Sequence, residues 1–349
     1  MEENRPVRVL IIDDSLVIRQ LLKDIFAKDG DIEVVDTASD PIEGYDKIVQ
    51  LKPDVLTLDV EMPRMDGITF LEKLMRSHPM PVVMISTLTR EGSEVTLKAL
   101  ELGAVDFIAK PTERVFTNMA ALSHEITSKV KAAARARVRP RAAHVAPVSA
   151  PSLPVSRGTT ARRLIAIGAS TGGPEAIRQV LQGLPADVPP IVIVQHMPPV
   201  FTRSFADRLD KLCTVRVKEA EDGDILQPGH AYVAPGDYHL QISANGSQLR
   251  ARVLQTELVN RHRPSVDALF DSVIQTTGRA TIAVLLTGMG ADGARGLKKL
   301  RDLGAHTIAQ DEETCVVFGM PREAIHLGGA EFVLPLPQIA HKVVELLAA

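Results

Sequence analysis

The chain has 349 residues, of which 45% are hydrophobic and 3% are aromatic, and its 40 basic and 43 acidic side chains leave a net charge of −3. This length predicts two domains, and the charge balance gives no reason to expect nucleic acid or an anionic membrane as a partner. The two cysteines, Cys213 and Cys315, form no CxxC pair, and no signal peptide or apolar run long enough to span a membrane is visible, so we expect a cytoplasmic protein without membrane insertion or a zinc site.

The N-terminal part of the chain alternates apolar runs of strand length with segments of helical periodicity. Strands are predicted at 7–12, 32–38, 55–58, 81–85 and 105–109, and helices at 16–26, 41–51, 68–75, 91–102 and 113–133. Five such alternations indicate an α/β fold with a doubly wound parallel sheet.

Chemically distinctive polar residues follow four of these five strands at the point where each strand ends. Asp13, Asp14, Asp59, Ser86 and Lys110 should share the carboxyl edge of the sheet. Three neighbouring carboxylates repel one another unless a cation lies among them, and oxygen ligands suit Mg²⁺. A lysine beside them could meet an added anion. The alternative, ordinary surface acids at loop starts, is disfavoured because four separate strand ends carry such residues.

The N-terminal part combines Asp13-Asp14, Asp59, Met62-Pro63, Asp66-Gly67, Ser86 and Lys110-Pro111. On these residues, the segment from 7 to about 125 resembles the receiver domain of two-component response regulators. It implies a flavodoxin-like (βα)5 fold in which Asp59 accepts a phosphoryl group from a CheA-type histidine kinase. It further implies that Asp13, Asp14 and Asp59 hold Mg²⁺, that Lys110 contacts the phosphoryl group and that Ser86 swings toward it.

The composition changes at residues 129–162, which are basic and rich in proline and alanine. We interpret them as a linker whose first residues extend the preceding helix. The predicted domains are therefore 1–128 and 163–349. The basic side chains could contact an acidic surface, although solvated linker charge is the favoured interpretation.

The C-terminal part has a second alternating pattern. Strands are predicted at 164–167, 190–194, 281–286, 305–309 and 331–334, with helices at 175–181, 201–212, 267–276, 294–303, 321–327 and 337–347. Thr202 is a possible cap of the second of these helices. Residues 215–254 show short alternating runs broken by Pro-Gly and Asn-Gly, which predict hairpins. We therefore expect a doubly wound, mostly parallel α/β domain with an inserted β-hairpin region.

The turn Gly168-Ala-Ser-Thr-Gly172 follows the first of these strands. Its pattern fits a nucleophilic serine at Ser170, a phosphate-binding loop or a plain turn. A phosphate loop is weakened because no lysine accompanies the glycines. His196 and Asp292 follow two further buried strands, and strand ends at one sheet edge could join the three into a triad. By itself, His196 would fit a structural polar residue equally well.

Four motifs stand out in this part: Gly-Ala-Ser-Thr-Gly-Gly-Pro (168–174), Gln-His-Met-Pro (195–198), Arg-Pro-Ser-Val-Asp (263–267) and Leu-Thr-Gly-Met-Gly-Ala-Asp-Gly (286–293). Together they resemble the CheB family of chemotaxis methylesterases. The resemblance implies hydrolysis of glutamate γ-methyl esters on methyl-accepting chemotaxis receptors and deamidation of receptor glutamines. The triad would be Ser170, His196 and Asp292, and the esterase reaction would need no cofactor.

Other residues of the second part are weaker candidates for the same chemistry. Backbone N–H groups near Thr171 and Met289 could stabilise an oxyanion. His262 and Arg263 could line the substrate cleft, or they could belong to a surface helix cap. The family is thought to block its own active site until it is phosphorylated, so we expect faster turnover when Asp59 carries a phosphoryl group.

Two other functional classes stay open at this point. The second domain could keep the esterase fold but act only as a binding module, an interpretation that the intact triad disfavours. A DNA-binding regulator lacks support because we find neither a helix-turn-helix candidate nor a basic C-terminal half.

Overall fold

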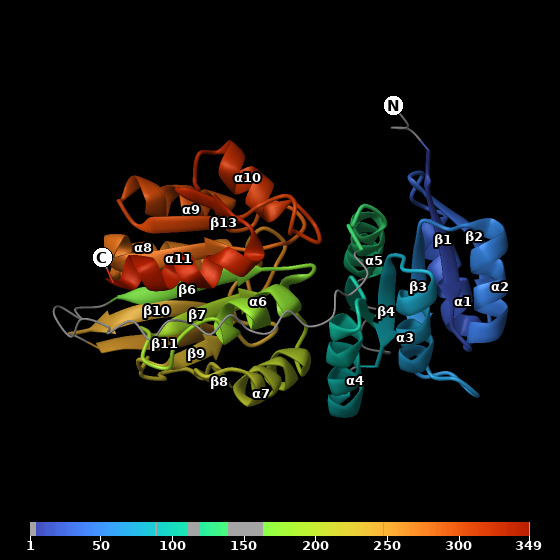
Figure 1. The fold of residues 1–349 in the computed structure, drawn as a ribbon, viewed down its shortest axis with the longest axis horizontal. Helices are drawn as coiled ribbons and strands as arrows, with labels where there is room; N and C mark the ends of the chain where they lie inside the picture. The colour runs from blue at the N-terminus through green and yellow to red at the C-terminus, as the bar shows by residue number, and fades with distance from the viewer. Residues whose placement is uncertain (1–4, 88, 111–118, 139–162, 247, 349) are drawn as a thin grey trace. The chain divides into compact units, whose positions relative to one another are not determined.

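The computed structural model describes residues 5–87, 89–110, 119–138, 163–246 and 248–348. The chain divides into two compact units, Met1–His144 and Val145–Ala349 (Figure 1). Pro111, the predicted helix start at 113–118 and the predicted linker residues 139–162 lie outside the described ranges. The limits of the predicted domains therefore stay predictions.

The first unit is a five-stranded parallel sheet in the order β2-β1-β3-β4-β5, as the alternating pattern predicts. Its elements are β1 (Val7–Ile12), α1 (Leu16–Phe26), β2 (Ile32–Ala38), α2 (Pro41–Leu51), β3 (Val55–Asp59), α3 (Gly67–Ser77), β4 (Val82–Ser86), α4 (Arg90–Glu101), β5 (Asp106–Ala109) and α5 (Met119–Ala134). Every residue of β3 and β4 is buried. Strands of this kind need helices on both faces of the sheet.

Polar residues in the loops begin the helices of this unit. The side chain of Ser15 accepts a hydrogen bond from the N–H of Ile18 at the start of α1, and that of Asp66 accepts one from Thr69 at the start of α3. Such caps satisfy N–H groups that have no partner inside the helix, at about 1 kcal/mol each. They fix where each loop at the carboxyl edge ends, and with it the positions of the acidic residues that the loops carry.

The second unit has a seven-stranded sheet in the order β14-β13-β12-β6-β7-β9-β8, and all its neighbouring strands run parallel. Its elements are β6 (Leu164–Ala169), α6 (Gly173–Gln182), β7 (Ile191–Gln195), α7 (Phe201–Leu212), β8 (Arg216–Glu219), β9 (His230–Val233), β10 (His239–Asn245), β11 (Gln248–Leu254), α8 (Val266–Thr276), the short 3-10 helix η2 (Gly278–Ala280), β12 (Thr281–Leu285), α9 (Ala294–Asp302), β13 (His306–Gln310), α10 (Met320–His326), β14 (Phe332–Leu334) and α11 (Leu336–Ala348). The three central strands β12, β6 and β7 are buried throughout.

The hairpin prediction for residues 215–254 is correct for one pair of strands only. β10 and β11 form an antiparallel hairpin, whereas β8 and β9 join the main sheet and pair with each other in parallel. A run of four residues is too short for its alternation to reveal the direction of its partner. The segment between β8 and β9 is a crossover rather than a tight turn, which is what parallel pairing requires.

The cap predicted at Thr202 is also wrong. The N-cap position of α7 is Val200, and the hydroxyl of Thr202 lies inside the first turn. It donates to Glu219 Oε1 at 2.7 Å and accepts from the N–H of Gly236 at 3.0 Å. Thr202 therefore connects α7 to β8 and to the loop after β9.

The helices in the described part of the chain include no candidate for a membrane span, since none combines sufficient length with sufficient apolar character.

Candidate active site and phosphorylation site

Ser170 lies on the sharp turn between β6 and α6. Its N–H donates to the carbonyl of Thr287 at 3.0 Å, and its carbonyl accepts from the N–H of Gly173 at 2.7 Å and from Nε2 of Gln195 at 2.9 Å. A Cβ at Gly288 would lie 2.7 Å from the Cβ of Ser170, so glycine is required there. Within the described residues, the hydrogen bonds recorded for Ser170 all involve its backbone, which leaves the hydroxyl available for chemistry.

His196 follows β7 directly beside this turn. The register pairs Ala169 with Gln195, so Ser170 and His196 are the next residues on two neighbouring strands. Nε2 of His196 lies 2.8 Å from Oδ2 of Asp292, and the side chains are 8% and 2% exposed. Nδ1 of His196 is buried without a hydrogen-bond partner in the described part of the chain. Nδ1 is therefore the ring nitrogen that is left to accept a proton.

Asp292 lies after β12, at the N-terminus of α8. It accepts hydrogen bonds from the hydroxyl of Ser265 at 2.8 Å and from the N–H groups of Val266 at 2.7 Å and Asp267 at 3.2 Å. Burial would raise the pKa of Asp292, but His196 and the surrounding donors outweigh it and hold that pKa well below the usual range. The helix N-terminus also favours the anion. Asp292 thus stays ionised and can orient the imidazole.

The two candidate oxyanion donors flank this turn. Thr171 is buried, and its carbonyl accepts from Oγ1 of Thr287 at 3.0 Å. Among the described residues, no backbone hydrogen bond is recorded for the N–H of Met289. Gly172 is the N-cap residue of α6, with a φ of 75°, and no side chain caps the N–H groups of the first helical turn. This arrangement is suited to negative charge developing next to Ser170.

Of the two weaker candidates, His262 contacts His196, whereas Arg263 forms an ion pair with another residue. The ring of His262 stacks on that of His196, with centroids 3.8 Å apart and planes at 12°. Arg263 instead pairs with Asp237, with Nη2 2.6 Å from Oδ1. Neither caps a helix, because Ser265 is the N-cap of α8. Sequence reasoning placed His262 near the site but missed Asn260, whose side-chain amide lies 2.6 Å from Asp292 Oδ1.

The three aspartates of the first unit lie together at the carboxyl edge of its sheet. One ligand oxygen each from Asp13, Asp14 and Asp59 lies within 4.8 Å of the other two. Nζ of Lys110 is 2.7 Å from Oδ2 of Asp59 and 3.9 Å from Oδ2 of Asp13. In the described part of the chain, Oδ2 of Asp13 is buried and accepts no hydrogen bond. A buried oxygen of this kind fits a hard divalent cation such as Mg²⁺.

The pKa values of these acids also support a cation site. Burial, followed by the charge of Asp59, raises the pKa of Asp13 to about 6. Burial also raises the pKa of Asp59, although the hydrogen bond from Lys110 acts in the opposite direction. Two buried carboxylates that resist ionisation together are stabilised when a cation shares them.

The hydroxyl of Ser86 is engaged with α4. It donates to the carbonyl of Gly92 at 3.2 Å and accepts from Oγ1 of Thr96 at 2.6 Å. The motion toward Asp59 that the sequence resemblance implies would have to break these contacts.

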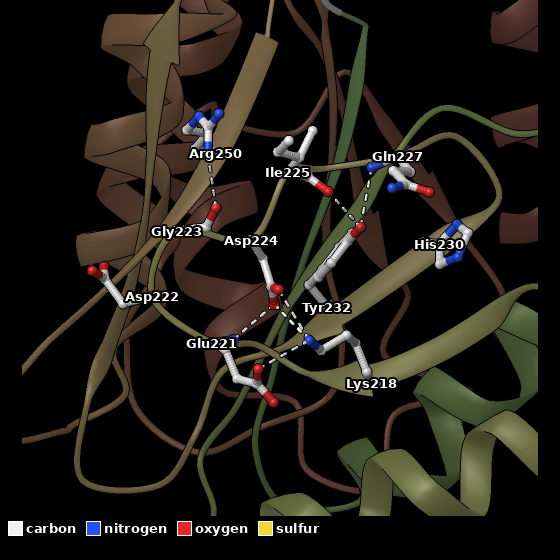
Figure 2. A pocket seen from close by; sticks show the side chains of 10 residues that line it. All are labelled: Lys218, Glu221, Asp222, Gly223, Asp224, Ile225, Gln227, His230, Tyr232 and Arg250. Carbon is white, nitrogen blue, oxygen red and sulfur yellow. Dashed lines mark hydrogen bonds and ion pairs between the residues drawn. The ribbon is translucent and has the colours of Figure 1, made fainter.

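A separate hollow of about 530 Å³ lies over β8, β9 and β11 (Figure 2). Ser170, His196 and Asp292 do not line it. Its carboxylates are paired: Asp224 and Glu221 with Lys218, and Asp222 with Arg252. The hydroxyl of Tyr232 donates to the carbonyl of Ile225 at 2.9 Å. The hollow is therefore a polar surface feature apart from the candidate active site.

Comparisons with known proteins find a family for each part of the chain. Residues 165–343 match the family model described as CheB methylesterase, and residues 9–119 match that of the response regulator receiver domain. The chain is 54% identical to a protein-glutamate methylesterase/protein-glutamine glutaminase of Salmonella typhi, over 98% of this chain and 97% of that protein. The protein of the same name from Escherichia coli strain K12 is also 54% identical, with the same coverage. Among solved structures, the Thermotoga maritima CheB methylesterase catalytic domain matches with a TM-score of 0.52 and 46% identity, over 53% of this chain and 98% of that one.

Proposed function

The chain belongs to the CheB methylesterase family, and from this premise we propose that it is a protein-glutamate methylesterase and protein-glutamine glutaminase regulated by phosphorylation of its receiver domain. It hydrolyses glutamate γ-methyl esters on chemotaxis receptors and serves adaptation in chemotaxis signalling. The observation that carries the proposal is the hydrogen bond between His196 and the ionised Asp292, beside the turn that holds Ser170.

The reaction proceeds through an acyl-enzyme. Nδ1 of His196 takes the hydroxyl proton of Ser170 as the oxygen attacks the ester carbonyl. The oxyanion that forms is stabilised by backbone N–H groups near Thr171 and Met289, and one such donor is typically worth about 3 kcal/mol. The proton then passes from His196 to the departing methoxide, and methanol leaves.

Hydrolysis of the acyl-enzyme uses the same groups again. His196 takes a proton from water, the hydroxide attacks the acyl carbonyl, and the proton returns to Ser170 as the free glutamate is released. A receptor glutamine follows the same route with ammonia as the leaving group. Asp292 fixes the orientation of the imidazole in each step and stabilises the imidazolium.

We propose that the receiver domain controls this activity. Asp59 is its phosphorylation site, with a CheA-type histidine kinase as the phosphodonor, and Lys110 and Ser86 contact the phosphoryl group. Asp13, Asp14 and Asp59 would hold Mg²⁺, which would offset the negative charge of these acids and of the incoming phosphoryl group. We propose that the domains are residues 1–128 and 163–349, joined by a linker at 129–162. We also propose that the protein is cytoplasmic.

The experiment measures the rate at which the protein releases methanol from receptors that carry labelled methyl esters. The rate is compared with and without Mg²⁺ and beryllofluoride. Beryllofluoride mimics the phosphoryl group at Asp59. Release that rises with the mimic supports both parts of the proposal. Equal release with and without it would refute the regulation, and no release from folded protein would favour the binding-module alternative.

A further inference from the structure

We propose that the two-residue turn at Asn260 and Arg261 is a positioning element for the His196–Asp292 pair. Its Asn260 amide holds Asp292, and the His262 ring at the end of the turn holds His196. The activity arm of the test below rests on the proposed function, whereas the spectroscopic arm does not.

The turn has a tightly defined backbone. Val259 and His262 exchange both backbone hydrogen bonds, at 3.1 Å from Val259 N and 2.9 Å from His262 N. The two residues between them have positive φ angles, 51° at Asn260 and 68° at Arg261. This is the signature of a type I′ turn, in which asparagine is favoured at the first position. The turn therefore fixes the side chains of Asn260 and His262 relative to each other.

The Asn260 amide lies between two buried carboxylates. Its Nδ2 donates to Asp292 Oδ1 at 2.6 Å and to Asp267 Oδ2 at 2.7 Å, and its Oδ1 accepts from Nη2 of Arg295 at 2.8 Å. A reversed amide would point its oxygen at two carboxylates, so only this orientation is compatible with its neighbours. Burial, and then the charge of Asp292, raise the pKa of Asp267. The amide keeps the two acids apart while satisfying an oxygen of each.

His262 acts on the other member of the pair. Its ring covers one face of the His196 ring, while Asp292 holds the Nε2 edge. An imidazole held by one edge and one face has little freedom to rotate, so the direction of Nδ1 is fixed. Asp292 after β12 and His262 in the turn contact His196, and Asn260 links Asp292 to two further charged groups, Asp267 of α8 and Arg295 of α9.

Asn260→Gly is the sharpest variant because glycine accepts a positive φ and keeps the turn while the amide is lost. We expect kcat to fall roughly ten-fold or more, the size of losing one hydrogen bond to a charged group, with KM near that of the parent. The matched control is Asn245→Gly at the exposed end of the β10–β11 hairpin, which should keep the parent kcat.

His262 is tested by a pair of variants. At His262, the flat, uncharged ring of His262→Phe should retain most of kcat, whereas His262→Ala should not. This rescue separates a stacking role from proton transfer.

The spectroscopic arm follows the proton between His196 and Asp292 in full-length protein labelled with ¹⁵N-histidine. Asn260→Gly should shift or broaden its low-field ¹H resonance, and Asn245→Gly should not. A parent-like resonance in Asn260→Gly would overturn the inference, and so would a parent-like kcat. If the parent protein itself releases no methanol, the proposed function fails while the resonance still decides the role of the turn.

Discussion

Oγ1 of Thr96 donates a 2.6 Å hydrogen bond to Oγ of Ser86, and both side chains are buried. Oγ1 of Thr96 also lies 2.7 Å from the carbonyl oxygen of Gly92, so its single proton is shared between two acceptors. The two hydroxyls and one carbonyl form a small network between β4 and α4. In the proposed mechanism Ser86 must leave this network to reach a phosphoryl group on Asp59. The network therefore opposes activation, which makes it a sensitive point for substitution.

Thr96→Val removes the hydroxyl but keeps the shape of the side chain. We expect the half-maximal concentration of beryllofluoride for activation to fall several-fold, because a lost hydrogen bond is worth about 1 kcal/mol. The measurement is esterase activity against beryllofluoride concentration at saturating Mg²⁺. Thr69→Val, at the exposed start of α3, is the control and should leave the curve unchanged. A Thr96→Val curve identical to that of the parent would remove Thr96 from the switch.

Ser170→Ala should abolish turnover while binding of the methylated receptor survives. The backbone of Ser170 makes the hydrogen bonds recorded at the turn, so alanine keeps the fold of the site. The check is methanol release beside a direct receptor-binding assay. Turnover at the parent rate would mean that the nucleophile is another residue.

Asp292→Asn should lower kcat by roughly 10³ to 10⁴, as expected when the partner of a catalytic histidine is neutralised. The pKa of Asp292 lies below its usual range, so the folded state holds its charge more strongly than the unfolded state does. Its contribution to stability is present above about pH 4 and is lost as the pH falls below that value. Acid unfolding monitored in both proteins should show a weaker dependence on pH in Asp292→Asn, and an equal dependence would contradict the assignment.

Asp13→Asn tests the metal site through stability. The pKa of Asp13 is about 6 in the fold, above its unfolded value, so without Mg²⁺ its charge destabilises the receiver as the pH rises through 6. We expect Asp13→Asn to be more stable than the parent at pH 7, by about 3 kcal/mol at most, and similar at pH 4. The measurement is thermal unfolding without metal at both pH values.

Added Mg²⁺ is the second half of that test. It should stabilise the parent at pH 7 and have a much smaller effect on Asp13→Asn, because the variant has replaced a charged carboxylate ligand by a neutral amide. A stabilisation of equal size in both proteins would place the cation elsewhere.

Much of this arrangement could be predicted from the sequence. Buried strands that end in Asp13, Asp59, Ser170 and His196 are recognisable because parallel strands have long apolar runs and bring their carboxyl ends to one edge. The direction of β8 and β9 could not be predicted, since each has only four residues. Direction there depends on tertiary pairing rather than on local pattern.

The role of Asn260 was hidden for a different reason. Its function depends on a positive φ and on two carboxylates contributed by α8 and by the loop after β12. An asparagine before an arginine carries no motif, and only the assembled structure brings its amide to the acids. The turn also determines that His262 stacks on His196 while Arg263 pairs with Asp237, and the sequence alone does not show these directions.

The order of the strands in the second sheet has a consequence for synthesis of the protein on the ribosome. Ser170 and His196 follow β6 and β7, but Asp292 follows β12, which pairs with β6 on the side opposite β7. A nascent or truncated chain that ends before β12 therefore lacks the carboxylate that orients the base, and it also lacks the Thr287 carbonyl that holds the Ser170 turn. An incomplete product should accordingly be inert, so that unfinished chains cannot demethylate receptors outside the control of the pathway.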